Sequence, residues 1–302
     1  MINAKSKQKI LITGHRGFIG SILYIELTLL GYEVIKFTGN VNEISNWKKQ
    51  LQGINVIYHL ASIEYNASKS VFDDLDTNAI ATLKMLETIK FLNISPKIIF
   101  ASSSNIYSES KKLPIDESFK DSPSSIWSVH KLLSENYLKI YSKLLGIQVI
   151  SLRLSNVFGP STSKNISLRM ALNKMINMSI KNHKLTLYAN KNCIRDWIFI
   201  DDVIKAFLTS LDITNGTFNQ YLIGTGENIT IFDYANLIKN EAKIAYGIDL
   251  KVIENDEQLS PMAMRNFSPS CEKFISETGW RPKINSYKGI KITMEYFYEF
   301  IK

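Results

Sequence analysis

The chain has little cysteine, and this shortage narrows the class of protein. Its 302 residues include 2 cysteines, Cys193 and Cys271. Two thiols are too few for a disulfide framework, and their positions lack the spacing of zinc ligands. We therefore expect two reduced thiols in a cytoplasmic protein with no metal site.

Long apolar runs and concentrated basic segments are also missing. No stretch reaches the eighteen apolar residues that a membrane helix requires, and the polar N-terminus leads directly into a strand, so we expect no membrane span and no leader. The net charge is +8, but the lysines are scattered. This distribution predicts a solvated surface that could steer an anionic small substrate, and it gives no indication of nucleic-acid binding.

The most informative stretch that is present lies at Lys9–Gly20, which reads KILITGHRGFIG. A short apolar strand runs into Gly14, Gly17 and Gly20, and apolar residues then continue at helical spacing. A strand, a glycine turn and a helix N-terminus together form a phosphate-binding site, because free N–H groups and the positive end of the helix dipole point at the anion. We interpret this stretch as a dinucleotide-binding turn.

The end of the predicted second strand, Tyr32–Phe37, bears on the choice of cofactor. An acidic residue usually holds the adenosine ribose about twenty residues after the glycines, whereas this chain has Thr38, Gly39 and Asn40 there. Arg16 and Lys36 are candidate partners for a 2′-phosphate. The sequence slightly favours NADP over NAD.

Strands and helices alternate along the rest of the first half, which predicts a doubly wound parallel sheet, the Rossmann α/β fold, with a smaller α/β C-terminal substrate domain. We expect the dinucleotide-binding domain at 1–160, rejoined by about 190–226, and the substrate domain at 161–189 and 227–302. His59 lies in an apolar strand and is expected to be a packed, hydrogen-bonded side chain. Further expected elements are a helix at Asp76–Leu92, a strand at Lys97–Ala101 and a helix opened by Pro123.

Several ordered motifs resemble the extended short-chain dehydrogenases/reductases of the NAD-dependent epimerase/dehydratase group. Besides the glycine turn, they are His59-Leu60-Ala61, Ser102-Ser103-Ser104-Asn105-Ile106-Tyr107, Asn156-Val157-Phe158-Gly159-Pro160, Arg195-Asp196-Trp197 and Gly279-Trp280-Arg281-Pro282. The resemblance implies cofactor contacts from Gly14, Arg16, Gly17, Phe18, Ile19, Thr38, Asn40, Leu60, Ala61, Asn78 and Lys131. It implies that Ser103, Asn156, Arg195 and Arg265 bind a nucleotide-diphosphate sugar. It also implies a homodimer formed through the apolar faces of Ile80–Leu92 and Leu132–Leu145.

The chain departs from this family at one catalytic position. In the family, a catalytic tyrosine and a catalytic lysine lie four residues apart. Here Lys131 stands at the lysine position, and Trp127 stands at the tyrosine position. A phenol can give and take a proton, whereas an indole N–H only donates a hydrogen bond. The missing acid–base group is typically worth about 10²–10⁴ in rate.

Three interpretations follow. Another group carries the proton (His130, Tyr65, Glu64 or a water relayed through Ser103), or Trp127 polarises a keto-sugar oxygen and favours reduction, or the chain binds a dinucleotide without turnover. An acidic pair after Ser103 serves elimination in the family's 4,6-dehydratases, and this chain has Ser104 and Asn105 there. A dehydratase is therefore disfavoured, and the resemblance implies a 4-keto-sugar reductase or epimerase in surface-polysaccharide precursor synthesis. The alternative is a non-catalytic dinucleotide-binding relative.

Overall fold

The computed structural model describes residues 8–63, 70–107, 112–255, 257 and 259–300. Glu64 and Tyr65, two of the candidate proton carriers, lie outside the described residues. The strands are β1 (Lys9–Thr13), β2 (Glu33–Lys36), β3 (Val56–His59), β4 (Lys97–Ser103), β5 (Val149–Leu154), β6 (Asn156–Phe158), β7 (Lys184–Tyr188), β8 (Trp197–Phe199), β9 (Phe218–Ile223) and β10 (Lys251–Asn255). The α-helices are α1 (Phe18–Leu29), α2 (Ile44–Gln50), α3 (Val71–Leu75), α4 (Ala81–Leu92), α5 (Ile126–Leu145), α6 (Lys164–Ser167), α7 (Ala171–Asn182), α8 (Ile200–Thr209), α9 (Ile231–Tyr246), α10 (Pro261–Met264), α11 (Glu272–Thr278) and α12 (Ser286–Glu299). The short helical turns are the π-helix η2 (Asp76–Ile80) and the 3₁₀ turns η3 (Ser104–Ile106) and η4 (Ser210–Asp212).

The chain divides into two compact units. The first comprises residues 1–106, 121–153 and 206–221, and the second comprises 107–120, 154–205 and 222–302. The sequence predicts which stretches bind the cofactor and which bind the substrate. That division of roles between domains stays a prediction.

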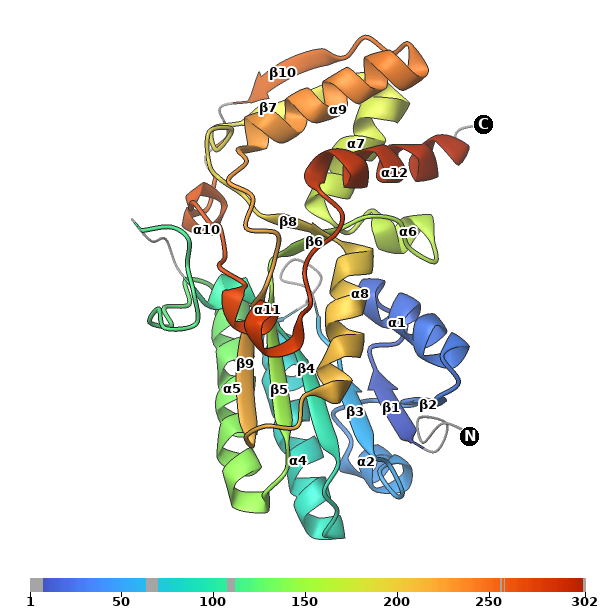
Figure 1. The fold of residues 1–302 in the computed structure, drawn as a ribbon, viewed down its shortest axis with the longest axis vertical. Coiled ribbons are helices and arrows are strands. Elements are labelled where there is room, and N and C mark those ends of the chain that lie inside the picture. Colours follow the sequence, from blue (N-terminus) through green and yellow to red (C-terminus); the bar gives the residue numbers. More distant parts are fainter. Residues whose placement is uncertain (1–7, 64–69, 108–111, 256, 258, 301–302) are drawn as a thin grey trace. The chain divides into compact units, whose positions relative to one another are not determined.

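A six-stranded parallel sheet in the order β2-β1-β3-β4-β5-β9 organises the first unit (Figure 1). The predicted doubly wound α/β fold is therefore confirmed. The central strands are buried along most of their length because both faces of the sheet are covered by helices. Leu11 pairs with Ile57, which pairs in turn with Ile98, and all three belong to one buried cluster.

Helices α2, α4 and α5 cover the face of the sheet that carries Leu11, Ile57 and Ile98. They contribute Trp47, Leu86 and Leu138 to the same cluster, each of them fully buried. On the opposite face, the Tyr58 hydroxyl donates to the backbone oxygen of Phe207 at 3.0 Å. Burying large aromatic groups on both faces holds the carboxyl ends of the strands in place, and ligands of such sheets bind at that edge.

Two predicted helix starts are corrected by the structure. Helix α5 begins at Ile126 and not at Pro123, because Ser125 is the N-cap and exchanges hydrogen bonds with Ser128 in a capping box. The helix expected from Asp76 begins earlier, at Val71, where Ser70 caps α3, and it passes through the π-helical turn η2 before α4. Such single π turns recur at functional sites.

The second unit is built from two small sheets and three long helices. Strands β7 and β10 pair in parallel, as do β6 and β8, and helices α7, α9 and α12 contact one another. A Cβ added at Gly289 on α12 would lie 2.6 Å from the Phe158 ring, so this glycine lets the helix approach β6 closely.

The described residues contain no helix that is both long enough and apolar enough to cross a bilayer. Within the same part of the chain, no group of three or more His, Cys, Asp or Glu residues could hold a metal ion.

Candidate active site

The glycine turn between β1 and α1 is a cradle formed by backbone. Gly14 has a φ of +69°, and a Cβ there would lie 2.6 Å from the backbone carbon of Leu60. A Cβ at Gly20 would lie 2.2 Å from the backbone oxygen of Gly14. Gly17 is the N-cap of α1 and supplies no side-chain hydrogen bond to the first turn. The N–H groups at this helix start therefore suit the pyrophosphate of a dinucleotide.

A chain of buried polar groups fixes the neighbouring end of β3. The Thr13 hydroxyl accepts from the amides of Leu60 and Ala61 at 3.0 and 3.1 Å and lies 3.0 Å from His59 Nδ1. His59 Nε2 lies 3.1 Å from the Thr82 hydroxyl. Burial and the charge of Lys131 lower the pKa of His59 to about 3, so the ring is neutral. His59 is thus the packed histidine expected from the sequence.

At the end of β2, the residues expected near the adenosine ribose are held by protein contacts. Gln50 accepts from the amide and hydroxyl of Thr38 at 2.8 and 3.2 Å, and Asn40 Oδ1 accepts from the Asn42 amide at 2.9 Å. Lys36 Nζ lies 4.0 Å above the Tyr24 ring. The side chain of Thr38 is therefore engaged by the protein itself.

The basic residues of the glycine turn lie in one positive region. The Arg16 side chain is exposed. The pKa of His15 is lowered by burial and then by the charges of Arg16 and Lys36. Arg16 and Lys36 therefore both lie within electrostatic reach of His15.

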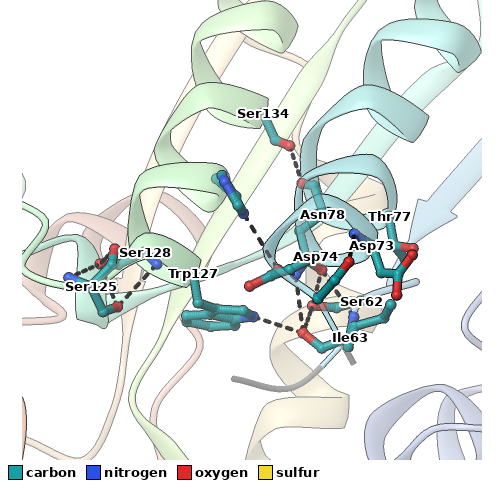
Figure 2. A network of polar contacts seen from close by, with 12 residues as sticks. Ser62, Ile63, Asp73, Asp74, Thr77, Asn78, Ser125, Trp127, Ser128 and Ser134 are labelled. Atoms are coloured by element: carbon teal, nitrogen blue, oxygen red, sulfur yellow. Dashed lines mark hydrogen bonds and ion pairs between the residues drawn. The ribbon is translucent and has the colours of Figure 1, made fainter. Parts of the chain in front are cut away.

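Trp127, in the first turn of α5, is hydrogen-bonded to the protein backbone. Its Nε1–H donates to the backbone oxygen of Ile63 at 2.9 Å, as Figure 2 shows. Asn78 holds the same residue from the other side, since it donates to the Ile63 oxygen and accepts from the Ile63 amide, both at 3.0 Å. Indole has a single N–H donor. A sugar oxygen would have to displace Ile63 to accept it.

His130 follows Trp127 on α5 and faces helix α3. Its Nδ1 lies 3.4 Å from Asp74 Oδ1, and both side chains are buried. Asp74 also accepts a hydrogen bond from Asn78 (Figure 2). The Asp74–His130 pair thus belongs to the network that holds Ile63. A direct role of His130 in proton transfer stays a prediction.

Lys131 points toward the sheet. Its Nζ donates to the backbone oxygen of Ala101 at 3.0 Å and lies 5.0 Å from the Phe100 ring centre and 5.6 Å from that of Trp127. Burial lowers the pKa of Lys131 to about 8, although Glu135 and Asp74 act in the opposite direction. The whole Lys131 residue is 3 % exposed.

Ser103 lies on the same strand, two residues after the carbonyl that Lys131 contacts. Its hydroxyl accepts from the Asn105 amide at 3.1 Å and can still donate a hydrogen bond. It is 8 % exposed. Lys131 and Ser103 are therefore brought to the same end of β4.

The second unit brings Arg195 and Arg265 close together, and both are buried. Arg195 donates to the backbone oxygens of Met262 and Ala263. Arg265 donates to the backbone oxygen of Tyr107, and its guanidinium lies 4.7 Å from the Phe267 ring centre. Burial, and then the charge of Arg195, lowers the pKa of Arg265. Two buried cations that repel each other are stabilised by an anion between them.

Asn156 of the second unit donates from Nδ2 to the backbone oxygen of Asp196 at 3.1 Å. Asp196 accepts from the amides of Thr225 and Gly226 at 3.0 and 2.8 Å. From the sequence alone, Arg195 could instead form a structural ion pair with Asp201 or Asp202. Asp202 accepts from the backbone amides of Lys283 and Ile284 near α12.

Comparison with known proteins decides the family. The sequence model of the NAD dependent epimerase/dehydratase family matches residues 10–224. The chain belongs to this family. It is 30% identical over 305 residues to a Methanocaldococcus jannaschii protein provisionally named UDP-glucose 4-epimerase, with 93% of this chain and 96% of that protein covered. It is 26% identical to the dTDP-4-dehydro-6-deoxyglucose reductase of Escherichia coli, covering 94% and 96%.

Solved structures of the same fold are also similar. A UDP-glucose 4-epimerase from Thermotoga maritima, in complex with UDP-glucose, matches with a TM-score of 0.86 and 23% identity over 98% of this chain and 100% of the other. RMD from Pseudomonas aeruginosa, complexed with NADPH, matches with a TM-score of 0.83 and 21% identity over 97% and 99%. These matches agree with the Rossmann fold described above.

The sequence did not indicate the residues that hold Ile63 in place beside Trp127. Asp74 was not singled out, and Asn78 was expected to touch the cofactor, whereas its side chain is engaged with Ile63, Ser62 and Asp74. The spacing of Asp74 and Asn78, one helical turn apart, could have indicated their contact. Their common partner Ile63 follows β3 and is distant in sequence, so no local pattern pointed to it.

Proposed function

We propose that the protein is an NADP(H)-dependent oxidoreductase or epimerase that acts on a nucleotide-diphosphate sugar at the stage of a 4-keto sugar. The observation that carries this proposal is the cradle at Gly14 and Gly20, where an added Cβ would strike backbone at 2.6 and 2.2 Å. Such close approach leaves the first turn of α1 open to a pyrophosphate. The bound nicotinamide would supply the hydride chemistry.

The basic region at the end of β1 supports NADP over NAD. Arg16 and Lys36 both act electrostatically on His15, and a 2′-phosphate would bring negative charge to this region. Thr38 and Asn40 supply no carboxylate that would repel it. The Pseudomonas aeruginosa structure of similar fold was solved with NADPH.

The buried arginine pair of the second unit supports an anionic substrate. The backbone carbonyls of Met262 and Ala263 orient the Arg195 guanidinium without neutralising its charge. Guanidinium groups match the geometry of phosphate oxygens. We assign Arg195, Arg265 and Asn156 to the diphosphate of the sugar nucleotide, the ligand class named for several relatives.

Trp127 sets the direction of the reaction. Without a phenol, the chain has no group at this position that could take a proton from a sugar hydroxyl. Hydride transfer to a keto sugar requires only a polarised oxygen and a proton donor. Ser103, at the end of β4, can donate a hydrogen bond to that oxygen. Reduction is therefore favoured over oxidation.

The test is a turnover assay with purified protein. NADPH or NADH is incubated with dTDP-4-dehydro-6-deoxyglucose, and NADP⁺ or NAD⁺ with UDP-glucose and UDP-glucuronic acid, while absorbance follows the nicotinamide. We expect oxidation of NADPH by the keto sugar and tighter binding of NADPH than of NADH. Tighter binding of NADH would contradict the NADP assignment.

A second candidate function is dinucleotide binding without turnover. The hydrogen bond from Trp127 to Ile63 favours it, because this bond engages the indole in holding the fold. If no sugar in the panel changes the cofactor while Trp127→Tyr acquires activity, the native chain is a binding protein. Activity of the native chain on any of these sugars rules this candidate out.

Three finer assignments rest on the resemblance and are part of the proposal: a cytoplasmic location, a role in surface-polysaccharide precursor synthesis, and a homodimer. The outer faces of α4 and α5 expose Phe91, Ile140 and Leu144, which suits helix pairing across a two-fold axis. Light scattering tests the dimer, since Leu144→Glu should convert it to a monomer.

A further inference from the structure

We propose that Lys131 itself carries the proton of the reaction, giving it to the keto oxygen in place of the missing phenol. This assignment rests on the proposed function and extends it to a named acid. Its basis is geometric. Lys131 Nζ contacts the Ala101 carbonyl at 3.0 Å, two residues before Ser103 on the same strand, so the ammonium group lies at the end of β4 that presents the serine hydroxyl.

The other groups near this position are engaged elsewhere. The only N–H of the Trp127 indole donates to Ile63 at 2.9 Å. His130 turns toward Asp74, at 3.4 Å, because adjacent helix positions point about 100° apart. A serine hydroxyl alone is too weak an acid to supply a proton near neutral pH. Among these side chains of α5, Lys131 is the titratable one whose polar group is directed at β4.

The charged groups around Lys131 are already paired with other partners. On its own helix, Glu135 is bound by Arg153 at 2.6 Å. Asp74 on α3 faces His130 and Asn78. His59 on β3 is neutral, and β4 presents the Ala101 carbonyl and the Phe100 ring. Within the described residues, no carboxylate lies within ion-pair distance of Lys131 Nζ.

A buried ammonium group without a carboxylate partner loses its proton more easily than one in water. Burial accordingly lowers the pKa of Lys131 to about 8. At neutral pH the amine is protonated and able to donate, and it can regain a proton from solvent after each turnover. Lysines shifted in this way are established acid–base groups in enzymes.

The carbonyl carbon of the sugar receives the hydride from the reduced nicotinamide, and the carbonyl π bond breaks toward oxygen. The oxygen forms an O–H bond with the proton from Lys131 Nζ, while the Ser103 hydroxyl orients it. The products are the sugar alcohol, the oxidised nicotinamide and a neutral amine, which takes up a proton from water.

The experiment compares the native chain with Lys131→Arg. A guanidinium group keeps the positive charge and the hydrogen-bond donors but does not release its proton below about pH 12. NADPH affinity is measured by fluorescence titration, and the rate with dTDP-4-dehydro-6-deoxyglucose is measured from pH 6 to pH 10. We expect the native rate to fall tenfold per pH unit above about pH 8. Lys131→Arg should retain NADPH binding and lose about 10²–10⁴ in rate, without that break.

Lys97→Arg is the matched control. Lys97 opens the same strand, its pKa is also lowered to about 8 by burial, and it donates to the backbone oxygens of Leu211 and Ile213 at 2.7 and 2.6 Å. Because it lies at the opposite end of β4 from Ser103, its replacement should leave the rate and the pH profile unchanged.

A second measurement is independent of turnover and of the stability of the variants. Protein labelled with ¹³Cε-lysine is titrated by NMR, and the Lys131 resonance is assigned by its absence from Lys131→Arg. We expect it to titrate near pH 8. Titration together with the ordinary lysines near about 10.4 overturns the proposal.

The two proposals fail in different ways. If Lys131→Arg keeps the native rate and the native break, the proton role of Lys131 is wrong while the nucleotide-sugar function stands. If the native chain binds no nicotinamide nucleotide and turns over no sugar of the panel, the proposed function is wrong, and the role of Lys131 in it is overturned as well.

Discussion

The starts of α1 and α5 solve the same local problem in opposite ways. Every α-helix begins with N–H groups that have no partner within the helix. At α1 the N-cap is Gly17, which has no side chain to offer them. At α5, Ser125 and Ser128 satisfy each other's backbone in a capping box. The first start is built to receive an anion, and the second is closed by the protein itself.

The start of α1 leaves backbone donors available to a ligand, whereas the start of α5 places side chains that contact other parts of the protein. The glycine turn exposes backbone donors and removes side chains that would obstruct a phosphate. The start of α5 directs Trp127 toward Ile63, which Asn78 also binds (Figure 2). It directs His130 toward Asp74. Lys131, which follows His130 on α5, directs its polar group at the Ala101 carbonyl of β4.

The largest effect is expected from Gly20→Ala. Its Cβ would lie 2.2 Å from the Gly14 oxygen, so the turn or the helix must move. Overpacking of this kind typically costs about 1–3 kcal/mol of unfolding free energy, and NADPH affinity should fall about 100-fold, equivalent to about 2.7 kcal/mol. Denaturant unfolding and fluorescence titration measure the two effects. Gly17→Ala, where the added Cβ would lie at 3.2 Å, should destabilise less.

Arg195→Gln extends the comparison to the second unit. Removing one of two buried guanidinium groups should weaken UDP-glucose binding about 10- to 100-fold, or about 1.4–2.7 kcal/mol, because a charged hydrogen bond to phosphate is lost. Calorimetric titration measures the change. NADPH affinity should be unaffected. Arg281→Gln, which alters an exposed arginine of the same unit, is the control, and an equal loss there would contradict a specific role for Arg195.

Acid should destabilise the fold through the buried side chain of His59 on β3. The pKa of His59 is about 3 in the folded protein against 6.5 for the free side chain, so between these values the unfolded chain binds a proton that the folded chain does not. The unfolding free energy should therefore decrease as pH falls from 6.5 toward 3, by up to about 1.4 kcal/mol per pH unit. Urea unfolding at several pH values measures this slope. His59→Asn should flatten it, whereas His183→Asn, at an exposed helix end, should not.

The smallest effect is expected from Trp127→Phe, which removes the indole N–H and keeps an aromatic ring. The Ile63 oxygen retains its hydrogen bond from Asn78, so the loss should be about 1 kcal/mol. Hydrogen exchange at Ile63 and denaturant unfolding measure it. Trp47→Phe removes a similar bond, from Nε1 to the Val41 oxygen at 2.7 Å, and should leave turnover unchanged. No destabilisation by Trp127→Phe would show that the network does not hold Ile63.

Much of the fold could be predicted because its pattern is local. The apolar strands, the glycine turn and the alternation with helices appear as short periodic runs, and they correspond to β1, β3, β4 and the doubly wound sheet. The start of α5 was misplaced because Pro123 is a weaker helix-start signal here than the pairing of Ser125 with Ser128. The π-helical turn before α4 was missed because its sequence is that of an ordinary helix.

The sequence by itself determined the family, the glycine turn between β1 and α1 and the absence of a tyrosine four residues before Lys131, since each depends on residue type and spacing along the chain. Only the tertiary structure decided what the polar groups contact. The indole of Trp127 meets Ile63, His130 meets Asp74, and Lys131 is buried against Ala101 without a carboxylate partner among the described residues. These partners come from separate elements, and the burial that shifts the pKa of Lys131 exists only once the sheet and helices are packed.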